Sequence, residues 1–189
     1  MQLGAAMKNL ASDSSVKPKL EQVLELMEQG IEEGRNAIQG LRSSGSRPFD
    51  LVAALSAVHE EFSGQPGVDF RVNVVGRQHA LRTAIRSDIY RIGKEALVNA
   101  FSHSRAKRID LELEYTDSLT IRVRDNGCGI DPRMLDTGRE GHWGLAGMRE
   151  RATKIGGQFK ISSATDGTEV QLSVPGGIAF QRSSTDYSP

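Results

Sequence analysis

The sequence predicts an α/β (α+β) protein, a two-layer sandwich in which a mixed, mostly antiparallel sheet carries helices on one face, preceded by a helical hairpin. Three observations lead to this fold class. Five short segments alternate apolar and polar residues with the period of two that is typical of strands. Longer segments repeat apolar residues at helical spacing. The strands and helices are interleaved along the chain, which favours helices packed on a sheet.

Composition limits the function. The chain has 189 residues, enough for one substantial core or a medium domain with an appendage. Its 24 basic and 24 acidic side chains cancel and aromatic residues make up only 5%, so we expect no direct nucleic-acid partner and no membrane contact. The single Cys128 excludes an internal disulfide, and no apolar run approaches the roughly 20 residues of a membrane span. We expect a soluble intracellular chain, which could be a fragment of a longer protein.

Residues 1–45 are expected to form part of a helical hairpin. Residues 19–43 read as one long helix because apolar positions recur at alternating spacings of four and three. A shorter segment with Leu3, Met7 and Leu10 has the same spacing and ends in a polar turn. The exposed apolar seam could pair with a second copy of the chain, or the two helices could cap the domain that follows. The run 43–48 breaks the pattern and marks a domain boundary.

Residues 46–175 are expected to form the main domain, and 176–189 a disordered tail. The helices are predicted at 50–62, 89–104 and 145–155, the last ended by a glycine pair. The strands are predicted at 68–75, 108–115, 119–124, 158–163 and 168–174. In the first strand Val68, Phe70, Val72 and Val74 are expected to share one face.

The helix at 89–104 carries Glu95, Asn99 and His103, each four residues apart, so the three side chains stack along one edge. A carboxylate and an amide oxygen suit a hydrated Mg²⁺, and the imidazole suits a phosphate chain. The alternative is a solvated polar edge of an ordinary helix.

Two glycine-containing runs follow. The run 125–130, Asp-Asn-Gly-Cys-Gly-Ile, comes directly after a strand, where a hairpin turn is disfavoured because Asp131-Pro132 cannot begin a central strand. A carboxylate at the strand end could instead accept from an exocyclic amine, which selects adenine. The run 138–149 has four glycines, three residues apart, at a helix N-terminus that suits phosphates, although such a run is also typical of a mobile connection.

Together these stretches resemble the ATP-binding catalytic domain of bacterial sensor histidine kinases, a fold shared with gyrase-type topoisomerases, mismatch-repair ATPases and a class of heat-shock chaperones. Residues 92–106 resemble the N box of that family, 125–130 its first glycine box, 141–152 its second, and 166–168 its third. The second box is similar to that of the subfamily that phosphorylates response regulators with helix-turn-helix output domains. The resemblance covers about residues 80–175.

The resemblance implies a cytoplasmic bacterial chain whose parent protein could be membrane-anchored. It also implies ATP and Mg²⁺ as cofactors. Asn99 would ligate Mg²⁺, Glu95 would order water on the metal or assist proton movement, and His103 would face the phosphates. Asp125 would take the adenine amine, with Thr168 supporting it through water. Gly127 and Gly129 would shape the pocket, and residues 131–143 would form the lid. The remaining implied ATP-binding residues are His142, Gly144, Leu145, Gly147 and Met148.

The N-terminal helices are similar to the dimerisation and phosphotransfer hairpin of the same subfamily, which implies a homodimer in the full-length protein. That hairpin carries an acceptor histidine on its first helix, whereas no histidine precedes His59 here. We interpret His59 as a surface histidine, and expect that this chain binds ATP without phosphorylating itself. The alternatives to a histidine kinase are a serine kinase or ATPase of the same superfamily acting on a protein partner, and a nucleotide-responsive interaction module.

Overall fold

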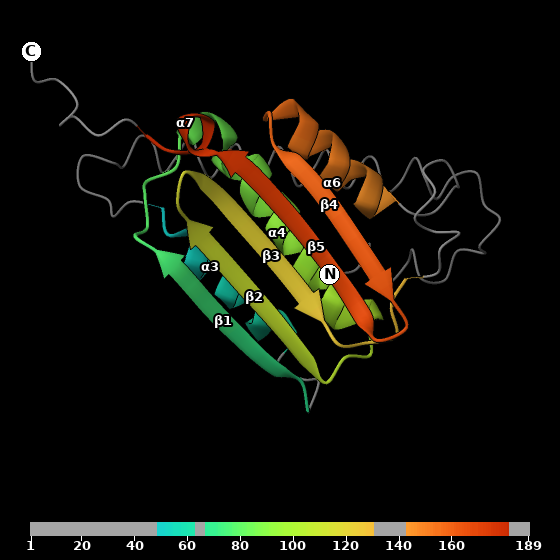
Figure 1. Cartoon of the computed structure of the whole chain (residues 1–189). Coiled ribbons are helices and arrows are strands. Elements are labelled where there is room, and N and C mark those ends of the chain that lie inside the picture. The colour runs from blue at the N-terminus through green and yellow to red at the C-terminus, as the bar shows by residue number, and fades with distance from the viewer. Residues whose placement is uncertain (1–48, 63–66, 131–142, 182–189) are drawn as a thin grey trace, which may run out of the picture. The chain divides into compact units, whose positions relative to one another are not determined.

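The computed structural model describes residues 49–62, 67–130 and 143–181 (Figure 1). The chain divides into two compact units, 1–47 and 48–189, and all described residues belong to the second. The predicted helical hairpin of residues 1–45 lies outside the described residues, and so do most of the expected lid and residues 182–189 of the expected tail.

The sheet has five strands in the order β1-β2-β3-β5-β4. The strands are β1 (Asp69–Gly76), β2 (Arg108–Tyr115), β3 (Ser118–Asp125), β4 (Gln158–Ala164) and β5 (Gly167–Pro175). Strand β1 pairs with β2 in parallel, and the other three pairs are antiparallel. A parallel pair needs a crossover, which α4 supplies between β1 and β2. The predicted mixed, mostly antiparallel sheet is therefore confirmed.

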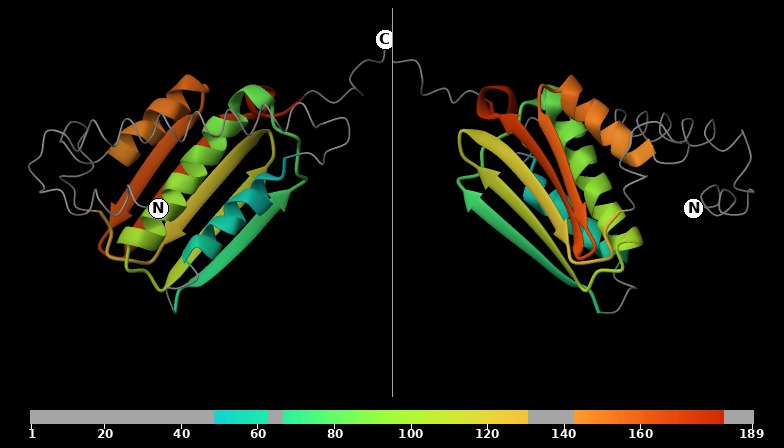
Figure 2. Two further views of the ribbon diagram at one scale, coloured as in Figure 1. Left: turned by 180° about the vertical axis from the view of Figure 1, so that it is seen from behind. Right: turned by 45° about the vertical axis from the view of Figure 1, so that its right-hand side comes forward.

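The helices cover one face of the sheet, as Figure 2 shows from behind. They are α3 (Leu51–Ser56), the 3₁₀-helix η1 (Ala57–Phe62), α4 (Thr83–His103), α6 (Trp143–Lys154) and α7 (Gly176–Ala179). Asp50 caps α3 by accepting from the Ala53 N–H at 3.0 Å. Helix α6 lies beside α4, and a 3.3 Å ion pair between Lys154 and Asp88 joins the two helices.

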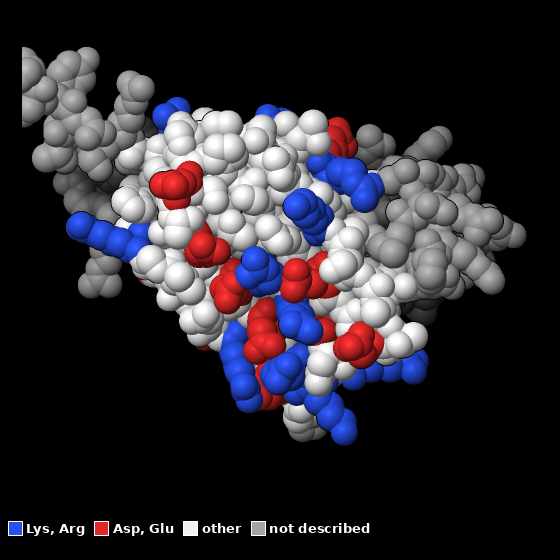
Figure 3. Space-filling view, in the orientation of Figure 1, with Lys and Arg blue, Asp and Glu red and all other residues white. Residues whose placement is uncertain are grey.

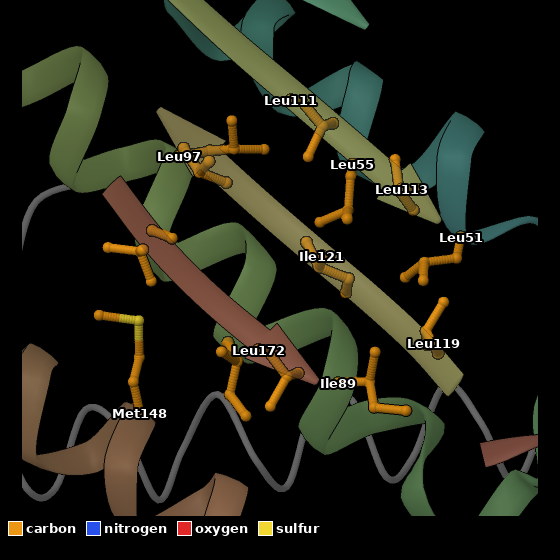
Figure 4. Packing of buried hydrophobic residues seen from close by; sticks show 14 of the residues in the cluster. Leu51, Leu55, Ile89, Leu97, Leu111, Leu113, Leu119, Ile121, Met148 and Leu172 are labelled. Carbon is orange, nitrogen blue, oxygen red and sulfur yellow. The ribbon is translucent and has the colours of Figure 1, made fainter. Parts of the chain in front are cut away.

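One hydrophobic core lies between the sheet and the helices. Every second residue of β2 is buried, and Ile109, Leu111 and Leu113 are fully so. Leu97 of α4 is also fully buried against this layer, and Figure 4 shows the packing from close by. An amphipathic helix and a strand with alternating apolar residues gain most of their stability by packing their apolar faces against each other. The core fixes the positions of the ends of α4 and β3.

The opposite face of the sheet is open and charged over part of its area (Figure 3). Its acidic and basic side chains alternate on neighbouring strands. Arg122 of β3 pairs with Glu112 of β2 and approaches Glu169 of β5 at 3.8 Å. Because opposite charges are interleaved, this face has no single-sign field for a charged partner.

Val72 and Val74, which were expected to share one face of the first strand, are 39% and 36% exposed, and β1 lies at an edge of the sheet. Two expectations differ from the structure. His59 was expected at the surface, but its ring is half-buried and stacks on Phe70 with 5.2 Å between ring centroids. Residues 176–181 were expected in a disordered tail, but Gly176–Ala179 form α7, in which Ala179 is completely buried. The Gln181 side-chain amide donates to the Leu81 carbonyl at 2.9 Å.

Candidate functional site

The polar column on α4 is formed as predicted from its spacing. Glu95 and Asn99 are half-buried, and His103 is the exposed last residue of the helix. The Asn99 side-chain amide donates to Glu95 Oε1 at 3.4 Å, a long contact that leaves the amide oxygen of Asn99 available as an acceptor. The column therefore presents oxygen ligands along one edge of α4.

Asp125 ends β3 and, with 7% of its surface exposed, is the one buried charged residue among those that the structure describes. Its Oδ1 accepts from the Gly127 N–H at 2.8 Å. Burial raises the pKa of this carboxyl above its ordinary value, while the hydrogen bonds from the Gly127 and Thr168 backbone N–H groups oppose that shift. The buried Asp125 carboxylate can therefore accept a hydrogen bond from a donor group of a ligand.

The loop after Asp125 is held against the far end of α4. The Cys128 N–H donates to the Ser104 carbonyl at 2.8 Å. Asn126 Oδ1 accepts from the N–H groups of Lys107 and Arg108, at 3.0 and 2.8 Å. Asn126 was quoted in the sequence motif but not among the predicted site residues. Its role could have been suspected from the sequence, because Asn side chains often hydrogen-bond to nearby backbone in turns.

The two glycines of this loop are required by close contacts within the protein. A Cβ at Gly127 would collide with the Ser104 carbonyl oxygen. Gly129 has a φ of +71°, and a Cβ there would collide with the Ala164 carbonyl oxygen in the β4–β5 turn. Both glycines therefore shape the site by allowing backbone elements to approach it from two sides.

The beginning of α6 faces the column on α4. A Cβ at Gly144 would collide with Glu95 Oε1 and lie 3.7 Å from Asn99 Nδ2. Gly147 lies beside Arg151, whose pKa is lowered by burial. Leu145 packs partly buried against the core, and Met148 is fully buried within it (Figure 4). The Met148 side chain is therefore not available to a ligand.

Thr168 lies opposite Asp125 in the β3–β5 register, and it is buried. The structure thus brings Asp125, Gly127, Gly129 and Thr168 together at one end of the sheet, and Glu95, Asn99 and Gly144 together between α4 and α6. The Cys128–Ser104 bond connects these two groups at the end of α4. His142 lies outside the described residues.

Two side chains of the site carry oxygen atoms that can ligate a divalent cation. Among the residues that the structure describes, no three His, Cys, Asp or Glu side chains gather as a metal site. Asn99 and Glu95 supply an amide oxygen and a carboxylate, which are ligands that Mg²⁺ accepts while it keeps several waters. These two side chains therefore fit a hydrated Mg²⁺.

Comparisons with known proteins agree with this geometry. A family model described as histidine kinase-, DNA gyrase B- and HSP90-like ATPase matches residues 84–178, about half of the chain. The chain therefore belongs to this family of ATPases. The match includes α4, the Asp125 loop, α6 and both strands of the final hairpin.

Curated relatives extend the likeness toward the N-terminus. The sensor histidine kinase LiaS of Bacillus subtilis is 29% identical over 167 residues, which is 87% of this chain and 45% of LiaS. The sensor protein VraS of Staphylococcus epidermidis is 29% identical over 92% of this chain and 51% of its own length. The chain spans about half the length of these relatives.

Solved structures share the fold. The histidine kinase domain of a blue-light activated histidine kinase from Erythrobacter litoralis has a TM-score of 0.56 and 21% identity, covering 92% of this chain and 93% of that one. Full-length ShkA, solved in complex with AMPPNP, has a TM-score of 0.59 and 16% identity, covering 94% of this chain and 42% of that one.

Within the described ranges, no helix has the length and apolar character needed to span a membrane.

The raised pKa of Asp125 predicts a pH-dependent stability. Because the folded-state pKa lies above the ordinary value of 3.8, the stabilisation is present below pH 3.8 and is lost as the pH rises through the folded-state pKa. Asp125→Asn does not titrate. Its free energy of unfolding should therefore increase relative to that of the unaltered chain across this window, measured by urea denaturation at a series of pH values without nucleotide. A flat or falling difference would contradict a pKa of Asp125 that burial raises.

Proposed function

We propose that this domain is the ATP-binding catalytic domain of a two-component sensor histidine kinase. It transfers the γ-phosphoryl group of ATP to a histidine, from which the group is relayed to a response regulator. The single observation that carries this proposal is the buried carboxylate of Asp125, connected through the end of α4 to the Glu95–Asn99 column.

Adenine recognition rests on Asp125. One carboxylate oxygen is engaged by the Gly127 N–H, which leaves acceptor capacity for an exocyclic amine. Guanine presents a carbonyl at the equivalent edge and would place two acceptors against each other. Burial of Asp125 strengthens this discrimination, since an unpaired buried acceptor is costly. Thr168 supports the base beside it.

Phosphate binding rests on α4 and the start of α6. Asn99 and Glu95 hold a hydrated Mg²⁺, and His103 faces the phosphates. The backbone around Gly144, in the first turn of α6, offers N–H groups at a helix N-terminus, which favours negative charge. When bound, the metal neutralises charge on the phosphates, and the protein's own contribution is positioning.

The relatives support this assignment over the alternatives. LiaS and VraS are a sensor histidine kinase and a sensor protein, and ShkA was solved with an ATP analogue. A response regulator follows as the partner of such a kinase, and the second glycine run supports one with a helix-turn-helix output domain. We also propose that the full-length protein is a homodimer through the helices that the sequence predicts in residues 1–45.

Nucleotide binding is the first test of the proposal. In calorimetric titrations, ATP should bind the chain, and Mg²⁺ should increase its affinity. Asp125→Asn should reduce affinity for ATP at least tenfold, because an amide cannot replace a buried carboxylate that accepts from both Gly127 and the base. Asn99→Ala should retain binding of ATP but lose its dependence on Mg²⁺.

Asp110→Asn, on the outer face of β2, is the matched control and should bind ATP as the unaltered chain does. An intact, folded chain that fails to bind ATP would contradict the proposal. So would an Asp125→Asn variant with full affinity.

Phosphoryl transfer separates the kinase from its alternatives. With radiolabelled ATP and Mg²⁺, label should appear on a helical acceptor peptide that carries a histidine followed by an acidic residue. Phosphohistidine is stable in alkali and labile in acid, and the label should be absent with Glu95→Gln. Acid-stable label on serine would favour a serine kinase. Tight ATP binding without any transfer would favour an interaction module.

A further inference from the structure

Ser163 near the end of β4 contacts two segments of the candidate site, the loop at Ile130 and the start of β5 at Gly167 and Thr168. Its Oγ accepts from the Ile130 N–H at 2.7 Å. The same atom lies 3.2 Å from Thr168 Oγ1 and 3.4 Å from the Gly167 carbonyl. Ser163 was part of a predicted strand, and no feature of the sequence marked it as a residue of the site.

A serine hydroxyl has one proton and two lone pairs. The Ile130 N–H occupies one lone pair. The Thr168 contact uses either the second lone pair or the proton, and the Gly167 carbonyl can only accept. In each arrangement one hydroxyl group holds both the Thr168 side chain and the backbone at Ile130.

These contacts lie directly against the adenine-recognising carboxylate. The Thr168 N–H hydrogen-bonds to Asp125, and Gly167 packs so closely on the Asp125 carbonyl that a Cβ at Gly167 would collide with it. Gly129, the neighbour of Ile130, approaches Ala164 equally closely. The β4–β5 turn therefore lies along one side of the site, and the Ser163 side chain connects Ile130 with Thr168 there.

We propose that Ser163 is a positioning residue for recognition of the adenine base. It orients the Thr168 hydroxyl and holds the Gly129–Ile130 backbone beside Asp125, without touching the phosphate-binding residues on α4 and α6. This inference rests on the proposed ATP-binding function. It assigns a role in base selectivity, so the loss of Ser163 affects the choice of base more than the binding of phosphates.

The test compares ATP with inosine triphosphate, which has the same phosphates but a carbonyl in place of the exocyclic amine. Calorimetry should show that Ser163→Ala binds ATP five- to tenfold more weakly, the effect of losing one or two hydrogen bonds of ordinary strength. Affinity for inosine triphosphate should change less than twofold, so the ratio of the two affinities falls.

Ser162→Ala is the matched control, because Ser162 is the neighbouring residue of β4 and is exposed. It should leave the ratio unchanged. Ser163→Thr retains a hydroxyl and should restore the ratio. Ser163→Cys keeps the size of the side chain but bonds weakly, so it should reproduce the loss if the alanine variant does not fold.

A folded Ser163→Ala or Ser163→Cys variant with the ratio of the unaltered chain would overturn this inference and leave the proposed function standing. Equal weakening of both nucleotides would also overturn it, because that result indicates a structural role alone. Failure of the unaltered chain to bind ATP would overturn the proposed function itself, and the inference with it.

Discussion

The site depends on the close approach of the Asp125–Gly129 loop to the end of α4. The Cys128 N–H bonds to the Ser104 carbonyl, and the absence of a side chain at Gly127 allows that distance. Ser104 in turn uses its own hydroxyl to accept from the Ala106 N–H at 3.0 Å, so the helix end is itself fixed. One backbone junction therefore determines where Asp125 lies relative to Asn99, which is on the preceding turn of α4.

Two further elements complete the site by the same means, a missing side chain. Gly144 brings the start of α6 against Glu95, and Gly129 brings the loop against the β4–β5 turn. The backbone at both places therefore lies beside residues of the candidate site. Burial of Asp125 follows from this convergence and raises the pKa of its carboxyl. The close packing of these backbone segments therefore also determines the chemical properties of the Asp125 carboxyl.

Much of the fold was predictable from sequence because its periodicities are strong. The alternation in β2 and the spacing of buried residues in α4 reflect direct burial on one face. The exposed valines of β1 were not predictable, because an alternating pattern does not reveal whether a strand lies at a sheet edge. Residues 176–181 were misjudged because glycines and a proline obscured the burial of Ala179.

The candidate site was predictable where local spacing carries the information. Glu95 and Asn99 follow from a helical repeat of four, and Asp125 from its place after a strand. Asn126 and Ser163 were missed because their roles depend on contacts with residues distant in sequence, such as Arg108 and Ile130. The roles of the glycines were predicted in part. Their tight contacts are made with protein backbone and with the Glu95 side chain, which no local pattern reveals.

The most direct test of this account is a crystal structure of the chain with AMPPNP and Mg²⁺. We expect the exocyclic amine of the base within hydrogen-bond distance of the Asp125 carboxylate, and the triphosphate between Asn99 and the backbone at Gly144. A nucleotide bound on the open, charged face of the sheet, or with its base away from Asp125, would contradict the central claim that this backbone junction builds an ATP site.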